Sequence, residues 1–193
     1  MEKIAVDAMG GDFAPLEIVL GSIQAVREFK IPVVLVGDKE QILTILKNNH
    51  EENNPLIEIH HASEVIEMGE HPGLAYRKKK DASVSVGARL VRAKECGALV
   101  APGSTGAAVT AGLLGIGRIK GIERPAILTP IPNEKGRYTY LIDSGASAQP
   151  KVETYVQNAI LGYIYASKVA GIKNPRIGCL LYTSPSPRDR SVS

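Results

Sequence analysis

The sequence predicts an α/β protein: an open, mostly parallel β-sheet with helices on both faces. Apolar runs alternate with segments whose apolar residues recur at helical spacing, and the runs repeatedly end in glycine. One run, PVVLVG (32–37), is an unbroken, mainly β-branched stretch of the kind that is buried on both faces of a parallel sheet. Ligands bind such sheets outside the carboxyl ends of the strands, so the loops that follow the strands are the candidate functional segments.

The chain begins with a strand and a helix. KIAVDAM (3–9) is typical of a strand, and three residues then end it: Gly10, Gly11 and Asp12. Pro15 stands where a helix begins. The apolar residues around and after it fall on one helical face: Leu16, Val19, Leu20, Ile23 and Val26. The run at 32–37 then forms the second strand.

A second helix and a third strand follow. Asp38, with Gln41 three residues later, predicts a capped start for a helix over 39–49. LIEIHH (56–61) is the third strand candidate. After an irregular acidic stretch and a basic run, the spacing predicts a helix over 83–96.

The second half of the chain continues the alternation. GALVAPG (97–103) predicts a strand, which a loop and a helix of small residues follow. PAILTP (125–130) and YTYLIDSG (138–145) are further strand candidates. The segment 151–170 predicts a long amphipathic helix, and RIGCLL (176–181) begins what should be another strand.

The stretch VAPGSTGAAVTAG (100–112) places a Gly-Ser-Thr-Gly turn in front of a helix with very small side chains. Backbone N–H groups and two hydroxyls at a helix N-terminus favour a bound anion. A plain strand-to-helix turn before a tightly packed helix explains the same residues. The anion site gains support because DAMGGD (7–12), APGSTG (101–106) and IDSGAS (142–147) are all expected at one edge of the sheet.

The composition excludes several classes of function. A net charge of +3, no tryptophan and two phenylalanines argue against nucleic-acid binding. No apolar run reaches the roughly 18 residues of a membrane span, and MEKIAVDAMGGD at the start is a strand and loop, not a signal peptide. Cys96 and Cys179 form neither a metal spacing nor a disulfide framework, which favours a reducing cytoplasm. We expect no metal and no cofactor, and a packed Cys96.

Motifs of several enzyme classes are absent. The chain has no Gly-x-Ser-x-Gly elbow, no lysine after Gly106 as a nucleotide-hydrolase loop requires, and no Gly-x-Gly-x-x-Gly after a strand. His60 and His61 are neighbours on a predicted strand. Their side chains therefore point to opposite faces and cannot share a metal.

Charged residues near the strand ends remain as candidates. Asp7 and Asp12 flank the first loop, and Asp143 occupies the same kind of position. Each is either a turn or helix-start carboxylate, or a group that orients a substrate or a cationic side chain. The run Arg77–Lys80 is either a solvated face or a cation patch for phosphate or an acidic protein.

Four blocks, in order along the chain, resemble the phosphate acyltransferase family of bacterial phospholipid synthesis (PlsX): IAVDAMGGDFAP, RKKKDAS, APGSTGA with GRIKGIERPAI, and LIDSGAS. The resemblance covers residues 1–178. It implies transfer of a fatty acyl group from acyl carrier protein to inorganic phosphate, giving acyl phosphate. It also implies a homodimer with a three-layer α/β/α sandwich similar to isopropylmalate dehydrogenases. Peripheral association of this cytoplasmic enzyme with the membrane is left open.

This chemistry agrees with the residues. Phosphate is its own nucleophile, so no catalytic serine, cysteine or histidine is needed, but the site must bind a dianion and stabilise an oxyanion. We assign phosphate binding to Gly103, Ser104, Thr105 and Gly106. The catalytic candidates are Lys79 and Asp143. The candidate substrate contacts are Asp7, Gly10, Gly11, Asp12, Arg77, Lys78 and Lys80.

The sequence departs from the family pattern at three positions. Ser104 and Ser147 stand where the family has asparagine, and serine keeps a donor and an acceptor with a shorter reach. Ala82 replaces a serine and cannot donate a hydrogen bond. Two other functions stay open: a short-chain phosphate acetyl- or butyryltransferase that uses coenzyme A, and a non-catalytic anion-binding domain.

The end of the chain abandons the β-α rhythm. YTSPSPRDRSVS (182–193) has two prolines spaced by serine and no apolar face, so it cannot bury enough surface to offset the entropy of ordering it. We expect residues 1–178 to be the N-terminal part of the acyltransferase domain and 179–193 to be a foreign or disordered tail. We therefore expect this chain to lack acyltransferase turnover and to be poorly soluble.

Overall fold

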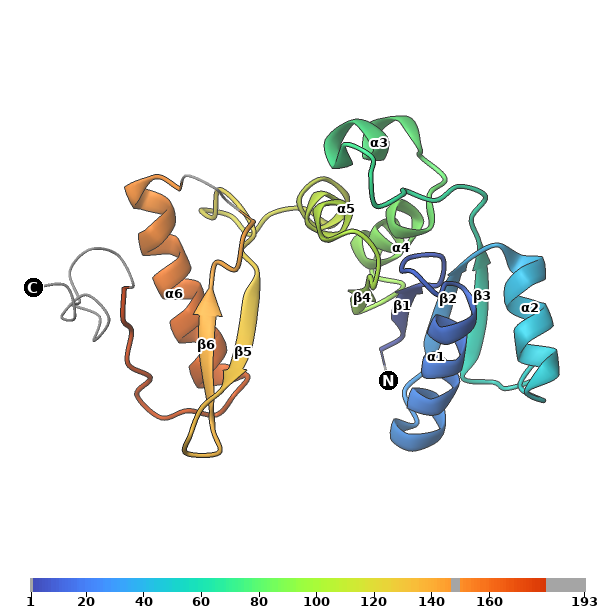
Figure 1. Cartoon of the computed structure of the whole chain (residues 1–193), viewed down its shortest axis with the longest axis horizontal. Coiled ribbons are helices and arrows are strands. Elements are labelled where there is room, and N and C mark those ends of the chain that lie inside the picture. Colours follow the sequence, from blue (N-terminus) through green and yellow to red (C-terminus); the bar gives the residue numbers. More distant parts are fainter. Residues whose placement is uncertain (1, 147–149, 180–193) are drawn as a thin grey trace, which may run out of the picture. The chain divides into compact units, whose positions relative to one another are not determined.

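The computed structural model describes residues 2–146 and 150–179 (Figure 1). It divides into two compact units, Met1–Pro125 and Ala126–Ser193. Ser147 and the predicted tail beyond Cys179 lie outside the described residues.

The first unit is built on a four-stranded, fully parallel sheet with the strand order β3-β2-β1-β4. The strands are β1 (Ile4–Asp7), β2 (Val33–Gly37), β3 (Ile57–His61) and β4 (Ala98–Val100). The helices are α1 (Leu16–Phe29), α2 (Lys39–Asn48), α3 (Pro72–Lys78), α4 (Ser83–Arg92), α5 (Thr105–Thr110) and the π-helix η1 (Ala111–Ile116). These strands confirm the parallel sheet that the sequence predicts.

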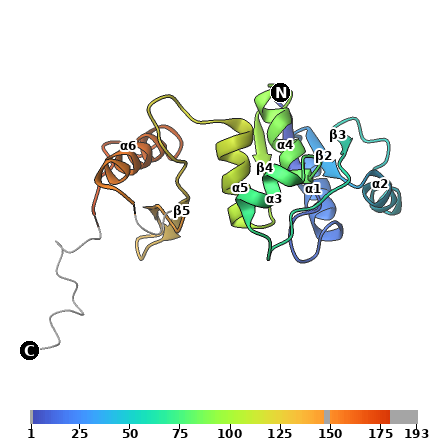
Figure 2. The same cartoon turned by 90° about the horizontal axis from the view of Figure 1, so that it is seen from above.

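Helices cover both faces of this sheet, which gives the three layers (Figures 1 and 2). Alternate strand residues point to opposite faces. Val6 and Leu35 pack with residues of α1 and α2 in one buried cluster, whereas Ala5 and Val34 pack with residues of α4 in another. All five residues of β2 are buried, as expected for a central strand of a parallel sheet.

In the first unit the structure confirms the predicted cap of α2 and the predicted burial of Cys96, and it differs from the prediction at Leu16 and at α3. The Asp38 side chain accepts a hydrogen bond from the Gln41 amide at 2.9 Å and caps α2. Cys96 is buried, and burial raises the pKa of its thiol. Leu16, however, is 49% exposed, so it does not join the buried face of α1. The acidic stretch after β3 was expected to be irregular, but Pro72 starts the short helix α3, which His71 caps.

The second unit departs from the predicted parallel sheet. Strands β5 (Leu128–Pro132) and β6 (Tyr138–Ile142) form a separate antiparallel pair. The five residues between them include Gly136 with a φ of +67°, and Asn133 accepts hydrogen bonds from the backbone of the same turn. A parallel crossover needs a dozen or more residues, so this connection permits only a hairpin.

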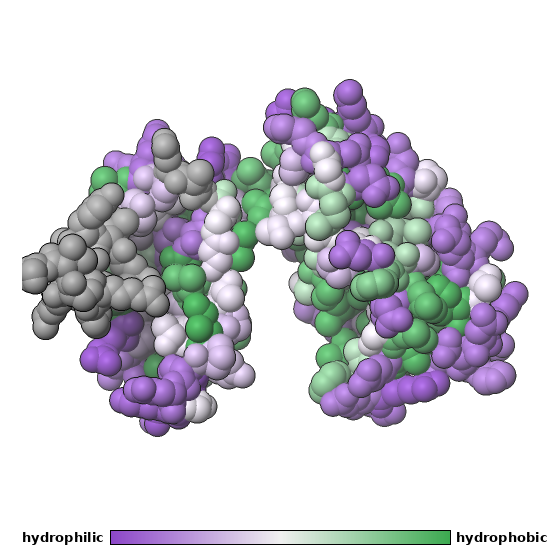
Figure 3. Space-filling view, in the orientation of Figure 1, coloured by the Kyte–Doolittle hydropathy of each residue, from purple (hydrophilic) through white to green (hydrophobic). Residues whose placement is uncertain are grey.

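The long helix α6 (Val152–Lys168) packs on this hairpin and confirms the helix predicted over 151–170. Thr154 and Asn158 are buried, while a row of apolar side chains is exposed: Val152, Tyr155, Val156, Ile160, Tyr163 and Ile164. Apolar as well as hydrophilic atoms reach the surface of both units (Figure 3). The described part of the strand expected over 176–181, residues 176–179, has no strand structure.

Candidate anion-binding site

Two of the three glycine-rich loops meet at the carboxyl edge of the parallel sheet. Strands β1 and β4 are neighbours, so the loop after each strand leaves the sheet at the same place. A Cβ on Gly10 would lie 2.9 Å from the Gly103 amide nitrogen, and a Cβ on Gly103 would lie 3.0 Å from the Gly10 Cα. Both positions need glycine because the two backbones touch. Gly11 has a φ of +107°, which also favours glycine.

Asp7 lies beneath this crossing and does not face solvent. Only 5% of the residue is exposed, and its Oδ1 accepts a hydrogen bond from the Met9 amide at 3.2 Å. Burial raises the pKa of the Asp7 carboxyl, while hydrogen bonds from Ser83, Met9 and Gly10 act in the opposite direction. In the described residues the Asp7 side chain contacts other protein groups, and its assignment to the substrate stays a prediction. Asp12, by contrast, is exposed in the same loop.

The Gly-Ser-Thr-Gly turn forms the start of α5, as predicted. Ser104 is the N-cap and its hydroxyl accepts from the Ala107 amide at 3.4 Å. Thr105 is exposed at the first helical position, and its hydroxyl has no hydrogen-bond partner among the described residues. A Cβ on Gly106 would lie 2.5 Å from the Pro72 Cγ, so Gly106 allows α3 to pack against α5.

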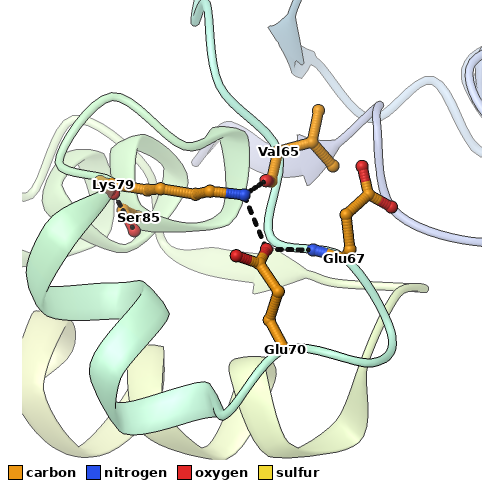
Figure 4. Close-up of polar contacts among 5 residues, drawn as sticks. All are labelled: Val65, Glu67, Glu70, Lys79 and Ser85. Atoms are coloured by element: carbon orange, nitrogen blue, oxygen red, sulfur yellow. Dashed lines mark hydrogen bonds and ion pairs between the residues drawn. The ribbon is translucent and has the colours of Figure 1, made fainter.

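The basic run ends helix α3, and its four members differ. Arg77, Lys78 and Lys80 are exposed. Lys79 is held: its Nζ donates to the Glu70 carboxylate and to the Val65 carbonyl, each at 2.6 Å (Figure 4). Glu70 also accepts from the Glu67 amide at 2.8 Å. The Lys79 side chain thus stabilises the loop before α3 through these two hydrogen bonds. Its hydrogen bond to Glu70 lowers the pKa of the Glu70 carboxyl.

The residues after the basic run tie this region to the sheet edge. Asp81 accepts from the amide and hydroxyl of Ser63, at 2.8 and 2.6 Å. Ser83, the first residue of α4, is buried and hydrogen-bonds to Asp7. Sequence reasoning missed Ser83 as a site residue, although its place directly after Asp81-Ala82 at a helix start was the available signal. The blocks DAMGGD, RKKKDAS and APGSTG therefore converge in the first unit.

Asp143 belongs to the second unit. It follows β6, and its Oδ1 accepts from the Ile127 amide at 2.9 Å and from the Ala146 amide at 3.1 Å. These bonds close the end of the hairpin. The expectation that IDSGAS follows a strand of the sheet that contains β1 and β4 is wrong, because among the described residues β6 pairs only with β5, in a separate two-stranded sheet.

Metal ligation and membrane spanning have no support in the part of the chain that the structure describes. Residues 2–146 and 150–179 contain no cluster of three histidine, cysteine or acidic side chains that could hold a metal ion. Within the same residues, no helix combines the length and the apolar character that crossing a membrane requires.

Comparison with known proteins identifies the family. A family model described as "Fatty acid synthesis protein" matches residues 2–186. The chain is 50% identical over 178 residues to a phosphate acyltransferase of Pelotomaculum thermopropionicum, covering 92% of this chain and 51% of the relative. It is 48% identical over 180 residues to a phosphate acyltransferase of Aquifex aeolicus, covering 93% of this chain and 53% of that protein.

The chain thus spans about half the length of the curated relatives that it matches. Both relatives carry the name phosphate acyltransferase, and the region that the family model matches includes both loops that meet at the sheet edge. The chain belongs to the fatty acid synthesis protein family, the PlsX family that its motifs indicate.

Proposed function

We propose that this chain contributes the phosphate site of an enzyme that transfers a fatty acyl group from acyl carrier protein to inorganic phosphate, giving acyl phosphate for phospholipid synthesis. The observation that carries the proposal is the contact between Gly10 and Gly103. It brings the loop of residues 8–12 against the turn at 103–106, whose Thr105 hydroxyl is exposed beside a helix start. A hydroxyl and backbone N–H groups at a helix start suit a phosphate dianion.

In the proposed reaction the protein positions the reactants and supplies no nucleophile of its own. A phosphate oxygen forms a bond to the thioester carbon, the C–S bond breaks, and the leaving thiolate takes a proton. The protein must hold phosphate next to the thioester and stabilise the oxyanion that develops on the acyl carbonyl. Phosphate contacts are proposed for residues 103–106, and substrate contacts for Gly10, Gly11 and Asp12 in the facing loop.

The proposed roles of the charged residues follow their exposure. Arg77, Lys78 and Lys80 are exposed and are proposed to contact the acidic carrier protein. Two of the three N–H donors of Lys79 are engaged, which leaves one for the substrate. Asp143 is proposed to orient the substrate, and the enzyme is proposed to act as a cytoplasmic homodimer, with peripheral membrane contact as a further proposal.

The test is a chimera in which residues 2–178 of this chain replace the matching half of the Pelotomaculum relative. Acyl phosphate formation is measured with acyl-acyl carrier protein and with acetyl-coenzyme A as alternative donors. We expect turnover with the carrier protein. Turnover only with acetyl-coenzyme A would replace the proposal by a short-chain phosphate acyltransferase. Phosphate binding without turnover in an otherwise folded chimera would support a non-catalytic anion-binding domain.

Charge reversal of Lys78 and Lys80 to glutamate tests carrier-protein binding. In the chimera we expect the KM for acyl-acyl carrier protein to rise several-fold at low salt while the KM for phosphate stays constant. The difference should shrink at high salt, because the Debye length falls from about 10 Å at 0.1 M to about 3 Å at 1 M. Unchanged kinetics at low salt would show that the run is a solvated face.

Replacement of Lys79 separates its two possible roles. Lys79→Met removes the ammonium group, whereas Glu70→Gln removes only the carboxylate that holds it. If Lys79 touches the substrate, we expect kcat of the chimera to fall at least tenfold more in Lys79→Met than in Glu70→Gln. Equal losses in the two variants would assign Lys79 to the loop before α3 alone.

A further inference from the structure

Asp7 is the only carboxylate residue that is buried among the residues that the structure describes. Its Oδ1 accepts a hydrogen bond from the Met9 amide, so its described contacts are with the protein itself. An ionised carboxylate is costly to bury without a cation. The Asp7 carboxylate lies next to Gly10, at the contact between Gly10 and Gly103.

Among the described residues, the groups that face Asp7 are all neutral. They are the Met9 and Gly10 amides of its own loop, the Ser83 hydroxyl at the start of α4, Val36 of the neighbouring strand β2, and the Gly103 backbone after β4. A Cβ on Gly10 would lie 2.7 Å from the Asp7 Oδ2 and 2.9 Å from the Gly103 amide nitrogen. A single glycine therefore separates the carboxylate from the turn that is proposed to hold phosphate.

We propose that Asp7 is a positioning residue that couples phosphate binding to its own protonation. This inference rests on the proposed phosphate site at 103–106. The protonated carboxyl supports the Gly10–Gly103 contact without repelling the ligand. The ionised carboxylate places a negative charge behind the turn, in a poorly solvated location where no described residue supplies a cation, and so weakens dianion binding.

The direction of the pH dependence follows from burial. Burial raises the pKa of the Asp7 carboxyl above its value in the unfolded chain, which is about 3.9. Below that value the group is protonated in both states. As the pH rises through the higher pKa of the folded state, the carboxylate forms, and the stability gained by binding a proton is lost. Phosphate binding should weaken over the same interval.

The experiment compares the complete 193-residue chain with its Asp7→Asn variant. Asparagine keeps the shape and an acceptor oxygen but cannot ionise. Affinity for inorganic phosphate is measured by titration calorimetry from about pH 4, near the unfolded-state pKa, up to about pH 8. At each pH the dissociation constant of the unsubstituted chain is divided by that of the variant. The titration of phosphate itself cancels in this ratio.

We expect the ratio to be smallest at the acidic end and to grow with pH, until the variant binds phosphate about tenfold more tightly, the factor for one unit of pKa coupling. Asp38→Asn, at an exposed helix cap, is the control and should keep the ratio constant. Ser83→Ala retains the carboxylate but removes a bond that lowers its pKa. This second variant should move the fall in affinity to higher pH.

The outcomes distinguish the inference from the proposed function. A constant ratio across the pH range, whether or not Asp7→Asn alters affinity, would overturn the coupling and leave the phosphate site standing. Absence of phosphate binding by the folded chain and by both Asp7→Asn and Ser83→Ala would overturn the phosphate site and the coupling together.

Discussion

Gly10→Ala is expected to abolish measurable phosphate binding by the chain and to lower its stability by about 1–3 kcal/mol, the usual cost of overpacking. The new Cβ would lie 2.9 Å from the Gly103 nitrogen and 2.7 Å from the Asp7 Oδ2. The nitrogen belongs to the backbone and the carboxylate is buried, so neither can move aside cheaply. Relief requires the two loops to separate, which displaces the turn at 103–106.

The control for this substitution is Gly21→Ala. Gly21 lies inside α1, and beyond its chain neighbours and the adjacent backbone of the helix no described heavy atom lies within 4 Å of its Cβ position. Because alanine is the better helix former, we expect this variant to gain about 0.5–1 kcal/mol and to bind phosphate unchanged. Thermal unfolding and phosphate calorimetry measure both effects. Normal phosphate affinity in Gly10→Ala would show that the contact between the loops does not shape the site.

The sequence predicted the first unit well because its signals are local and consistent. The β-branched run at 32–37 is buried on both faces, and Asp38 caps α2 as its spacing with Gln41 indicates. The convergence of DAMGGD and APGSTG followed from one topological rule, that parallel strands end at a common edge. The contact between Gly10 and Gly103 required coordinates, since it depends on β1 and β4 being neighbours.

The failures have equally physical causes. The rule about a common edge was applied to IDSGAS, although only five residues separate the strand before it from β5, too few for a parallel crossover. The sequence did not predict helix α3, because His71 and Pro72, which start it, stand at the end of a stretch whose acidic residues show no helical spacing. Charge pattern alone could not separate Lys79 from its neighbours, because Glu70 and the Val65 carbonyl are partners that only the fold supplies.

Thr105→Val should weaken phosphate binding about ten- to hundredfold, because a lost hydrogen bond to a charged group costs about 1.5–3 kcal/mol. Valine keeps the β-branched shape at the first position of α5. The Thr105 hydroxyl has no partner among the described residues, so its removal leaves no protein group unsatisfied, and the free energy of unfolding should hardly change. The substitution therefore separates ligand binding from folding.

Thr110→Val is the matched control, since the Thr110 hydroxyl donates to the Gly106 carbonyl at 2.8 Å inside the same helical segment. It removes the same chemical group one and a half turns further along, where no phosphate contact is proposed. We expect Thr110→Val to keep its phosphate affinity and Thr105→Val to lose it, measured by calorimetry on the 193-residue chain. Equal affinities in the two variants would mean that phosphate, if it binds, is held by groups other than this hydroxyl. The assignment of the Thr105 hydroxyl to phosphate would then fail.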